Sequence, residues 1–220
     1  MFARIAPRYD LMNRLMTVGQ DIHWRREVIQ RAAIPSGGSL LDLGAGTGDL
    51  ANEALRQHPG CRIVAADFTV QMMRYGIQHT SADIRWSVAD ALHLPFQTGV
   101  FDAVVSGFLL RNVTSLTQAL DEQYRVLKLG GRMVALDTTR PPRSLLSPLI
   151  GVHLKWVIPA LGQLVTGERE AYTYLPDSTA GFLRAEQLAA RMVFAGFREV
   201  GFHRLMFGTA AIHWGTKAEG

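Results

Sequence analysis

A glycine-rich stretch that follows an apolar run constrains the fold of this chain most strongly. It reads Leu40-Leu-Asp-Leu-Gly-Ala-Gly-Thr-Gly-Asp49, an apolar strand-like run that leads into a glycine turn and then into a helix-like run. Glycine adopts positive φ without strain and lets a ligand approach the backbone closely. A strand, a glycine turn and a helix in this order are typical of open α/β sheets, which bind ligands at the carboxyl ends of their strands. We therefore expect a parallel sheet with a ligand site at this turn.

Apolar strand-like runs alternate with helix-like runs from Ser39 to Asp137, which predicts parallel strands with helices on both faces of the sheet. The strands are apolar throughout because both of their faces are buried. The expected strands are Ser39–Asp42, Arg62–Asp67, Ile84–Val88, Phe101–Ser106 and Arg132–Asp137. The expected helices between them are Asp49–Gln57, Val70–His79 and Ser115–Val126, and we expect Lys128 to Gly131 to end the last helix with a glycine cap.

The end of the chain predicts one more helix and an antiparallel hairpin. The helix is expected at Arg184–Ala195, and the runs Glu199–Phe207 and Ala210–Gly215 are separated by Gly208-Thr209. Together with the five strands above, the hairpin makes a mostly parallel, Rossmann-like sheet of seven strands. We interpret residues 1–220 as one domain, with a helical addition at 1–38 and a substrate-side insertion at 138–181.

Composition removes several classes of protein. The chain has 220 residues, of which 48% are hydrophobic and 19% charged, enough apolar material for a buried core. Its net charge of +4 permits an anionic partner without requiring one. One cysteine, Cys61, excludes an intramolecular disulfide and a cysteine-rich metal site. The start has no secretory signal pattern, so we expect a cytoplasmic protein.

Two segments have apolar patterns that suggest contact with a lipid or a lid over the site. Residues 145–165 are as long as a membrane span, but His153, Lys155 and two prolines disfavour a spanning helix. They fit either a buried irregular segment or an apolar surface. Near the start, one face of a helix beginning near Pro7 carries apolar side chains, which either pack on the domain or cover a prenyl tail. This stripe is Phe2, Ile5, Tyr9, Met12 and Met16.

The glycine turn favours S-adenosylmethionine over a dinucleotide. The dinucleotide pattern Gly-x-Gly-x-x-Gly needs a glycine where this chain has Asp49, and an acid at a helix N-terminus repels a pyrophosphate. S-adenosylmethionine carries a sulfonium and an ammonium group and has no phosphate. Asp67 ends the second strand, where it can accept hydrogen bonds from the ribose hydroxyls, and Asp90 follows the third, where it can accept from the adenine amino group. Each acid alone could instead be a helix N-cap.

These observations predict a class I S-adenosylmethionine-dependent methyltransferase fold. The residues expected to contact the cofactor lie in the glycine turn or at the ends of the following strands. They are Asp42, Gly44, Gly46, Thr47, Asp67, Asp90, Ala91 and Ser106.

Several longer motifs resemble the ubiquinone/menaquinone biosynthesis C-methyltransferases, and the resemblance covers nearly the whole chain. The motifs are Phe2-Ala-Arg-Ile-Ala-Pro-Arg-Tyr-Asp-Leu-Met-Asn13, Gly19-Gln-Asp-Ile-His-Trp-Arg-Arg26, Leu41-Asp-Leu-Gly-Ala-Gly-Thr-Gly-Asp-Leu-Ala51, Leu109-Leu-Arg-Asn-Val113 and Glu168-Arg-Glu-Ala-Tyr-Thr-Tyr-Leu-Pro176. The resemblance implies methyl transfer to a ring carbon of a prenylated quinol. Two positions depart from the family pattern, which usually has glycine at Leu109 and often has cysteine at Ala45. The short start before Phe2 favours menaquinone, so we expect demethylmenaquinol as the substrate.

An aromatic carbon becomes nucleophilic when a ring hydroxyl ionises, so the enzyme must stabilise a phenolate near the methyl group. The resemblance places Arg111, Asn112 and Tyr9 in the active-site motifs. Arg111 can stabilise the phenolate or help remove its proton through water, Asn112 can orient the hydroxyl, and Tyr9 can complete the network. By chemistry alone, Arg111 fits a surface salt bridge and Tyr9 a half-buried helix residue. His153 and His213 are further acid–base candidates, although packing is the simpler role for each.

Three other functions compete with this interpretation. A small-molecule O-methyltransferase would need a catalytic histidine or a metal after the fourth strand, and Ser106-Gly-Phe-Leu-Leu-Arg-Asn112 offers neither. A nucleic-acid methyltransferase would need an Asn/Asp-Pro-Pro-aromatic turn after the fourth strand and a basic stripe, and this sequence has neither. A non-catalytic binding protein would be expected to lack one of the three acids Asp49, Asp67 and Asp90, and all three are present. We therefore expect no metal and no nucleic acid, with a quinol, a peripheral membrane surface and a homo-oligomer as the partners to consider.

Overall fold

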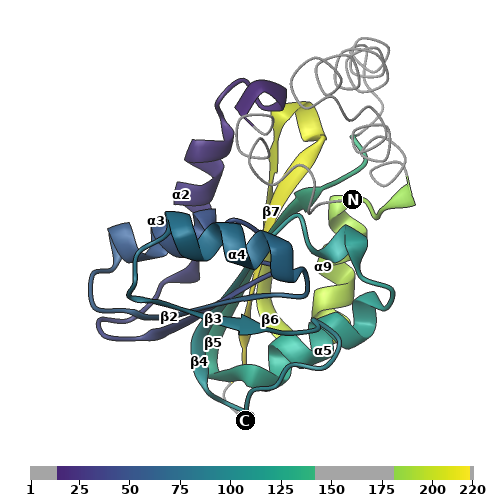
Figure 1. Ribbon diagram of the computed structural model, residues 1–220. Helices are drawn as coiled ribbons and strands as arrows, with labels where there is room; N and C mark the ends of the chain where they lie inside the picture. The colour runs from purple at the N-terminus through teal and green to yellow at the C-terminus, as the bar shows by residue number, and fades with distance from the viewer. Residues whose placement is uncertain (1–13, 142–180, 219–220) are drawn as a thin grey trace.

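The computed structural model describes residues 14–141 and 181–218, and within them seven strands form one sheet in the order β3-β2-β1-β4-β5-β7-β6 (Figure 1). β7 pairs antiparallel with β5 and β6, and the other neighbouring strands pair in parallel. The predicted mostly parallel sheet with a C-terminal antiparallel hairpin is therefore confirmed. The strands are β1 (Ser39–Leu43), β2 (Arg62–Asp67), β3 (Ile84–Val88), β4 (Phe101–Gly107), β5 (Leu127–Thr138), β6 (Phe197–Leu205) and β7 (Ala210–Lys217).

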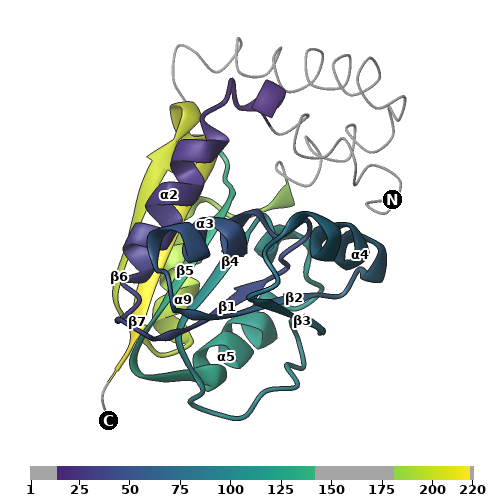
Figure 2. The ribbon, with the colours of Figure 1, turned by 60° about the vertical axis from the view of Figure 1, so that its left-hand side comes forward.

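Helices cover both faces of the sheet, as Figure 2 shows. They are α2 (Asp21–Ala32), α3 (Asp49–Gln57), α4 (Val70–His79), α5 (Leu116–Val126) and α9 (Ala185–Phe194), with 3-10 turns η1 (Leu110–Asn112) and η3 (Met206–Gly208). Successive strand residues face opposite sides, so β1 contributes Leu40 to one core and Leu41 to the other. Trp24 of α2 packs in the first core, and Leu120 and Leu188 of α5 and α9 pack in the second.

The predicted limits of β2, β3, α3 and α4 are confirmed, but the prediction for Lys128 to Gly131 is wrong. α5 ends at Val126, Leu127 is already extended, and these four residues lie inside β5. The pairing of β4 with β5 passes from Phe101 opposite Leu127 to Ala103 opposite Arg132, so the extra residues form a bulge. Gly130 takes a φ of +73°, which glycine tolerates without a Cβ penalty. The glycines therefore serve a bulge in the strand and not the end of a helix.

Most of the two apolar segments lies outside the described residues. This applies to residues 145–165 and to most of the predicted helix near Pro7. Of the apolar stripe on that helix, only Met16, half-buried, is among the described residues. No helix in the described ranges is both long and apolar enough to cross a membrane.

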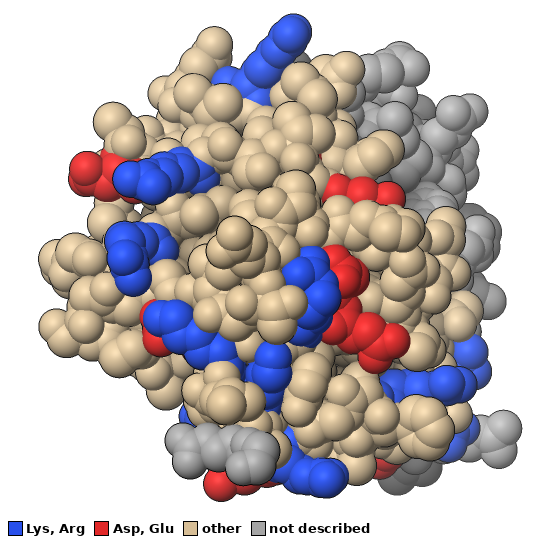
Figure 3. Space-filling model, turned by 90° about the horizontal axis from the view of Figure 1, so that it is seen from below, with Lys and Arg blue, Asp and Glu red and all other residues tan. Residues whose placement is uncertain are grey.

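The charged side chains on the face drawn in Figure 3 form small groups of both signs, with basic and acidic residues close to one another. This mixture agrees with the small net charge of +4. On this face, the described residues do not form the continuous basic stripe that a phosphate backbone would favour.

Candidate active site

A cleft of about 430 Å³ opens at the carboxyl ends of the parallel strands. Its walls come from the glycine turn after β1, the end of β2, the loop after β3 and the segment after β4. Arg25 of α2 closes one side. Because parallel strands all end at one edge of the sheet, the topology brings together residues that are far apart in the sequence.

The glycine turn is held in a conformation that other residues would strain. Gly44, Gly46 and Gly48 all have positive φ, between +58° and +88°. An added Cβ at Gly48 would lie 2.7 Å from Thr80 Cγ2, and one at Gly44 would lie 2.9 Å from Leu109 Cδ1. Leu109, which departs from the family pattern, therefore packs directly on the turn and lines the cleft.

Asp67, the last residue of β2, fixes the glycine turn. Its Oδ2 accepts a hydrogen bond from the Gly46 N–H at 2.8 Å, and its Oδ1 accepts one from the Thr69 N–H at 2.7 Å. Each carboxylate oxygen can accept more than one hydrogen bond, so both keep acceptor capacity toward the cleft that Asp67 lines. Phe68, which sequence reasoning missed, follows it as an exposed aromatic side chain in the same wall.

Asp42 is a buried carboxyl group with one oxygen in use. Its Oδ2 accepts a hydrogen bond from the Ala51 N–H of α3 at 3.0 Å, whereas its buried Oδ1 has no hydrogen-bond partner in the structure. Burial, reinforced by the nearby carboxylates of Asp67 and Asp49, raises the pKa of Asp42 to about 7. The side chain lines the cleft, so a cationic ligand group there would favour its ionised form.

The loop after β3 contributes Asp90 and Ala91 to the wall of the cleft, next to the end of β2. Asp90 is exposed, and its Oδ1 accepts a hydrogen bond from the Leu92 N–H at 2.9 Å. The His93 N–H donates to the Asp90 carbonyl at 3.0 Å, which closes a tight turn. Ala91 is buried and lines the cleft beside Asp90, so the two predicted residues share this wall.

Arg111 lines the cleft and forms a buried ion pair with Asp137. Its Nη1 contacts Asp137 Oδ1 at 2.7 Å, and its backbone N–H donates to Asp137 Oδ2 at 3.2 Å. The side chains are only 7% and 1% exposed, so this is not the surface salt bridge that chemistry alone suggested. Arg111 Nε is buried without a hydrogen-bond partner. Asp137 was missed, although an acid near the end of β5 repeats the pattern of Asp67.

The other predicted residues fall into three groups. Thr47 and Asn112 line the cleft, and Asn112 donates from Nδ2 to the Phe108 carbonyl at 2.8 Å. Ser106 is buried on β4 and its Oγ has no hydrogen-bond partner, while the next residue, Gly107, lines the cleft in its place. Tyr9 lies outside the described residues.

Arg25 is a further cleft residue that sequence reasoning missed. Its Nη2 contacts Asp21 Oδ2 of the same helix at 3.0 Å and Asp49 Oδ2 at 2.8 Å. Asp49, the first residue of α3, is therefore paired with Arg25 of α2. The cleft thus holds carboxylates and guanidinium groups side by side, which suits a zwitterionic ligand better than a polyanion.

The histidine and cysteine candidates have other surroundings. His213 is buried on β7, where its Nε2 lies 2.9 Å from the Ala185 carbonyl and burial lowers its pKa. Cys61 is buried in the first core, as predicted for a small hydrophobe. His153 is not among the described residues. Within the described ranges, no group of three or more His, Cys, Asp or Glu could hold a metal ion.

Comparison with known proteins gives consistent matches over the whole chain. A ubiquinone/menaquinone biosynthesis C-methyltransferase from Desulfotalea psychrophila is 44% identical over 218 residues, which cover 99% of this chain and 89% of that protein. A demethylmenaquinone methyltransferase from Thermus thermophilus is 43% identical over 220 residues, covering 99% of this chain and 100% of that protein.

The fold has a counterpart among solved structures, and a family model matches the sequence. The methyltransferase solved with the Haloferax volcanii Trm112 activator superimposes with a TM-score of 0.71 at 16% identity, covering 100% of this chain and 98% of that one. This likeness confirms the class I methyltransferase fold. The model of the ubiE/COQ5 methyltransferase family matches residues 1–217. The chain therefore belongs to the ubiE/COQ5 methyltransferase family.

Proposed function

We propose that this chain transfers a methyl group from S-adenosylmethionine to a ring carbon of demethylmenaquinol. The observation that carries the proposal is one cleft lined by two chemically different groups of residues. The glycine turn, Asp42 and Asp67 line one part, and Arg111, which is paired with the buried Asp137, lines another. Family membership and relatives named as C-methyltransferases of quinone biosynthesis support this assignment.

The residues present fit S-adenosylmethionine. Asp42 offers a buried oxygen without a partner, which suits the ammonium group, and Arg25 offers a guanidinium for the carboxylate of the same amino-acid moiety. Asp67 would accept the ribose hydroxyls and Asp90 the adenine amino group. Phe68 gives the base an apolar surface. When bound, S-adenosylmethionine supplies an electrophilic methyl group.

Arg111 is the residue we assign to the phenolate. A planar guanidinium with several donors can hold the oxygen anion in a fixed direction, and it carries a permanent positive charge. The Asp137 carboxylate accepts hydrogen bonds from Nη1 and from the backbone N–H of Arg111, so the Arg111 side chain is fixed before the substrate arrives. Arg111 Nε is buried without a hydrogen-bond partner, so it is a further donor for the phenolate. Asn112 stands beside it as a hydroxyl-orienting group, and Tyr9 remains a predicted third member.

The prenyl tail of the substrate requires contact with a bilayer, and we propose a peripheral association. Figures 1 and 2 show the start of the described chain and the β6–β7 turn at the same end of the molecule. There Val18 is 77% exposed and Phe207 is 74% exposed. Exposed apolar side chains near basic ones are the usual features of reversible binding to a lipid surface. Arg14 is an exposed basic residue at the start of the described chain.

Product analysis tests the function directly. The protein is incubated with methyl-labelled S-adenosylmethionine and a panel of demethylated quinols, and the products are identified by mass spectrometry. We expect label on a ring carbon of demethylmenaquinol. Label on a quinol oxygen would show an O-methyltransferase, and binding without any product would show a non-catalytic protein.

A further inference from the structure

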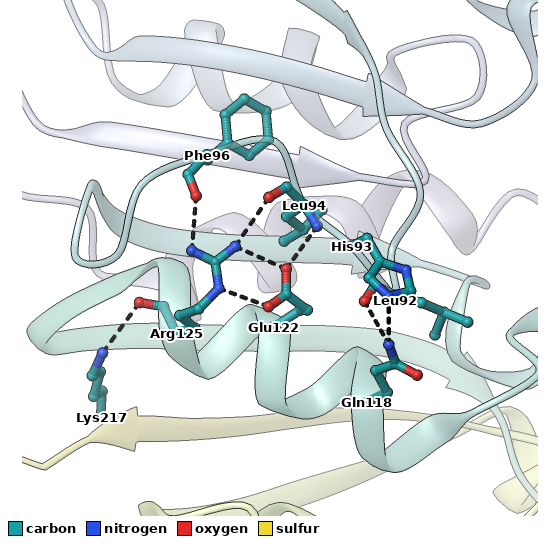
Figure 4. Close-up of polar contacts among 8 residues, drawn as sticks. All are labelled: Leu92, His93, Leu94, Phe96, Gln118, Glu122, Arg125 and Lys217. Atoms are coloured by element: carbon teal, nitrogen blue, oxygen red, sulfur yellow. Dashed lines mark hydrogen bonds and ion pairs between the residues drawn. The ribbon is translucent and has the colours of Figure 1, made fainter.

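The loop after β3 is held by a row of polar side chains on α5 (Figure 4). None of these side chains is among the residues that line the cleft. The row consists of Gln118, Glu122 and Arg125, which are spaced by four and three residues and so share one helix face. The neighbouring face of α5 buries Ala119 and Leu120 in the core. We call these three polar residues the α5 clamp.

Each member of the clamp binds the backbone of the loop. Gln118 Nε2 donates to the Leu92 carbonyl at 3.0 Å and lies 3.0 Å from His93 Nε2. Glu122 Oε2 accepts from the Leu94 N–H at 2.6 Å. Arg125 donates from Nη2 to the Leu94 carbonyl at 3.0 Å and from Nη1 to the Phe96 carbonyl at 2.8 Å.

Two further features make the clamp rigid. Arg125 Nε donates to Glu122 Oε1 at 2.6 Å, and these hydrogen bonds hold the pKa of the Glu122 carboxyl below its ordinary value. Lys217 of β7 donates from Nζ to the carbonyls of Arg125 at 3.3 Å and Leu127 at 2.8 Å, so it binds the end of α5 where carbonyls lack helical partners. The clamp is thereby anchored to the sheet as well as to the loop.

The loop is held both by apolar packing and by the α5 clamp. Leu94 is buried in the second core, and the ring of Phe96 packs edge-on against Phe101 of β4. Asp90 is exposed, and its side-chain contact to Leu92 is internal to the turn. The clamp adds the hydrogen bonds to the backbone of residues 92, 94 and 96. These residues directly follow Asp90 and Ala91, so the clamp bears on the position of this wall of the cleft.

We propose that the α5 clamp positions the loop that selects the adenine base, so that Gln118, Glu122 and Arg125 determine cofactor affinity and base discrimination. The inference rests on the proposed function for the identity of the ligand. The clamp does not contact the Arg111–Asp137 pair, so it should leave the methyl-transfer step itself nearly unchanged.

Binding and exchange measurements on Arg125→Ala and Gln118→Ala test the proposal. Loss of charged hydrogen bonds to the loop should raise the Kd for S-adenosylhomocysteine by about 5- to 50-fold in Arg125→Ala, with a smaller rise in Gln118→Ala. S-inosylhomocysteine, in which a carbonyl oxygen replaces the adenine amino group, cannot donate to Asp90 there. Wild type should therefore bind S-inosylhomocysteine more weakly than S-adenosylhomocysteine. The ratio of the Kd for S-inosylhomocysteine to the Kd for S-adenosylhomocysteine should fall toward one in both variants, because Asp90 is no longer held in position. At saturating S-adenosylmethionine, kcat should stay within about twofold of wild type.

Amide exchange gives a readout without any ligand, and a surface pair gives a matched control. Peptides covering residues 89–96 should exchange faster in both variants. Arg125→Ala releases Glu122, the acceptor of the Leu94 N–H, and Gln118→Ala removes the donor to the Leu92 carbonyl. Arg125→Lys, which keeps the positive charge but not the planar fork of donors, should recover part of the protection. The control is Arg56→Ala on α3. Arg56 pairs with Glu53 three residues before it, as Arg125 pairs with Glu122, but it does not contact the loop. This variant should change neither cofactor binding nor amide exchange in the loop.

The two proposals fail in different ways. Unchanged exchange in residues 89–96, or unchanged base discrimination in folded Arg125→Ala, would overturn the clamp. A fall of kcat equal to the rise in Kd would also overturn it, because the effect would then reach the whole cleft. If wild type binds neither ligand while the exchange pattern changes as expected, the proposed function is refuted and the clamp remains as a loop-positioning device. If Arg125→Ala does not fold, Gln118→Ala decides the outcome.

Discussion

Replacing Asp42 by asparagine should make the ligand-free protein more stable at neutral and alkaline pH. The wild-type carboxyl group is buried with one oxygen unpaired, and burial raises its pKa to about 7. Asparagine has nearly the same shape, keeps an acceptor for the Ala51 N–H and carries no charge. The variant therefore removes the cost of ionising a buried acid and preserves the contact that begins α3.

The size and sign of the effect follow from the two pKa values. In the unfolded chain the group ionises near 3.8, and in the folded protein near 7. Between these values the folded state binds more protons than the unfolded state, so the free energy of unfolding falls as the pH rises. The window of about three pH units corresponds to a penalty of at most about 4 kcal/mol, complete above the folded pKa. Below the unfolded pKa both states are protonated and the penalty vanishes.

Urea denaturation of wild type and Asp42→Asn across this range measures the effect. At about pH 8 the variant should be more stable by roughly 2–4 kcal/mol, and the difference should shrink toward zero near pH 4. Subtracting the two free energies of unfolding cancels the contribution of other acids such as Glu53. The hydrogen bond from Arg56 lowers the pKa of Glu53, so its stabilising effect is lost in acid, and it is lost equally in both proteins. Calorimetry should show weaker binding of S-adenosylhomocysteine by the variant, because the ammonium group loses its anion. A stability difference that does not change with pH would refute the reasoning.

Four further predictions concern the cofactor, Arg111, its pair with Asp137, and the membrane. Asp67→Ala should weaken S-adenosylhomocysteine binding by about 1–3 kcal/mol, because ribose hydroxyls lose their acceptor, and unchanged affinity in a calorimetric titration would contradict the assignment. Arg111→Ala should lower turnover by at least about tenfold with near-normal cofactor affinity, and Arg111→Lys should recover little, since a point charge cannot reproduce a planar contact; full activity of both variants would place the active site elsewhere. In urea denaturation, Arg111→Ala and Asp137→Ala should show a coupling free energy of about 2 kcal/mol or more, whereas additive effects would show that the buried pair is not a unit. The protein should sediment with anionic liposomes at low salt and be partly released at high salt, and Val18→Glu with Phe207→Glu should reduce sedimentation; wild-type protein that stays in the supernatant would exclude this surface.

Local patterns determined most of the secondary structure. The run Arg62–Asp67 is apolar along its middle and follows Gly60, so its length and type could be predicted without knowledge of its neighbours. The same holds for α3 and α4, whose limits match the prediction. The acids at the ends of β2 and after β3 could also be predicted as one site, because the strand order of such a sheet brings the carboxyl ends together.

The tertiary structure alone decided which polar groups meet. The sequence marks Arg111 as a charge near a helix end, and its partner Asp137 lies 26 residues away on β5. The Arg25–Asp49 pair and the α5 clamp depend in the same way on how helices lie against the sheet. The burial of Ser106 and the opening of Gly107 into the cleft depend on where β4 ends. Hydrophobic periodicity records whether a position is buried, which is a local property, whereas an ion pair needs two side chains whose separation is set by the packing of whole elements.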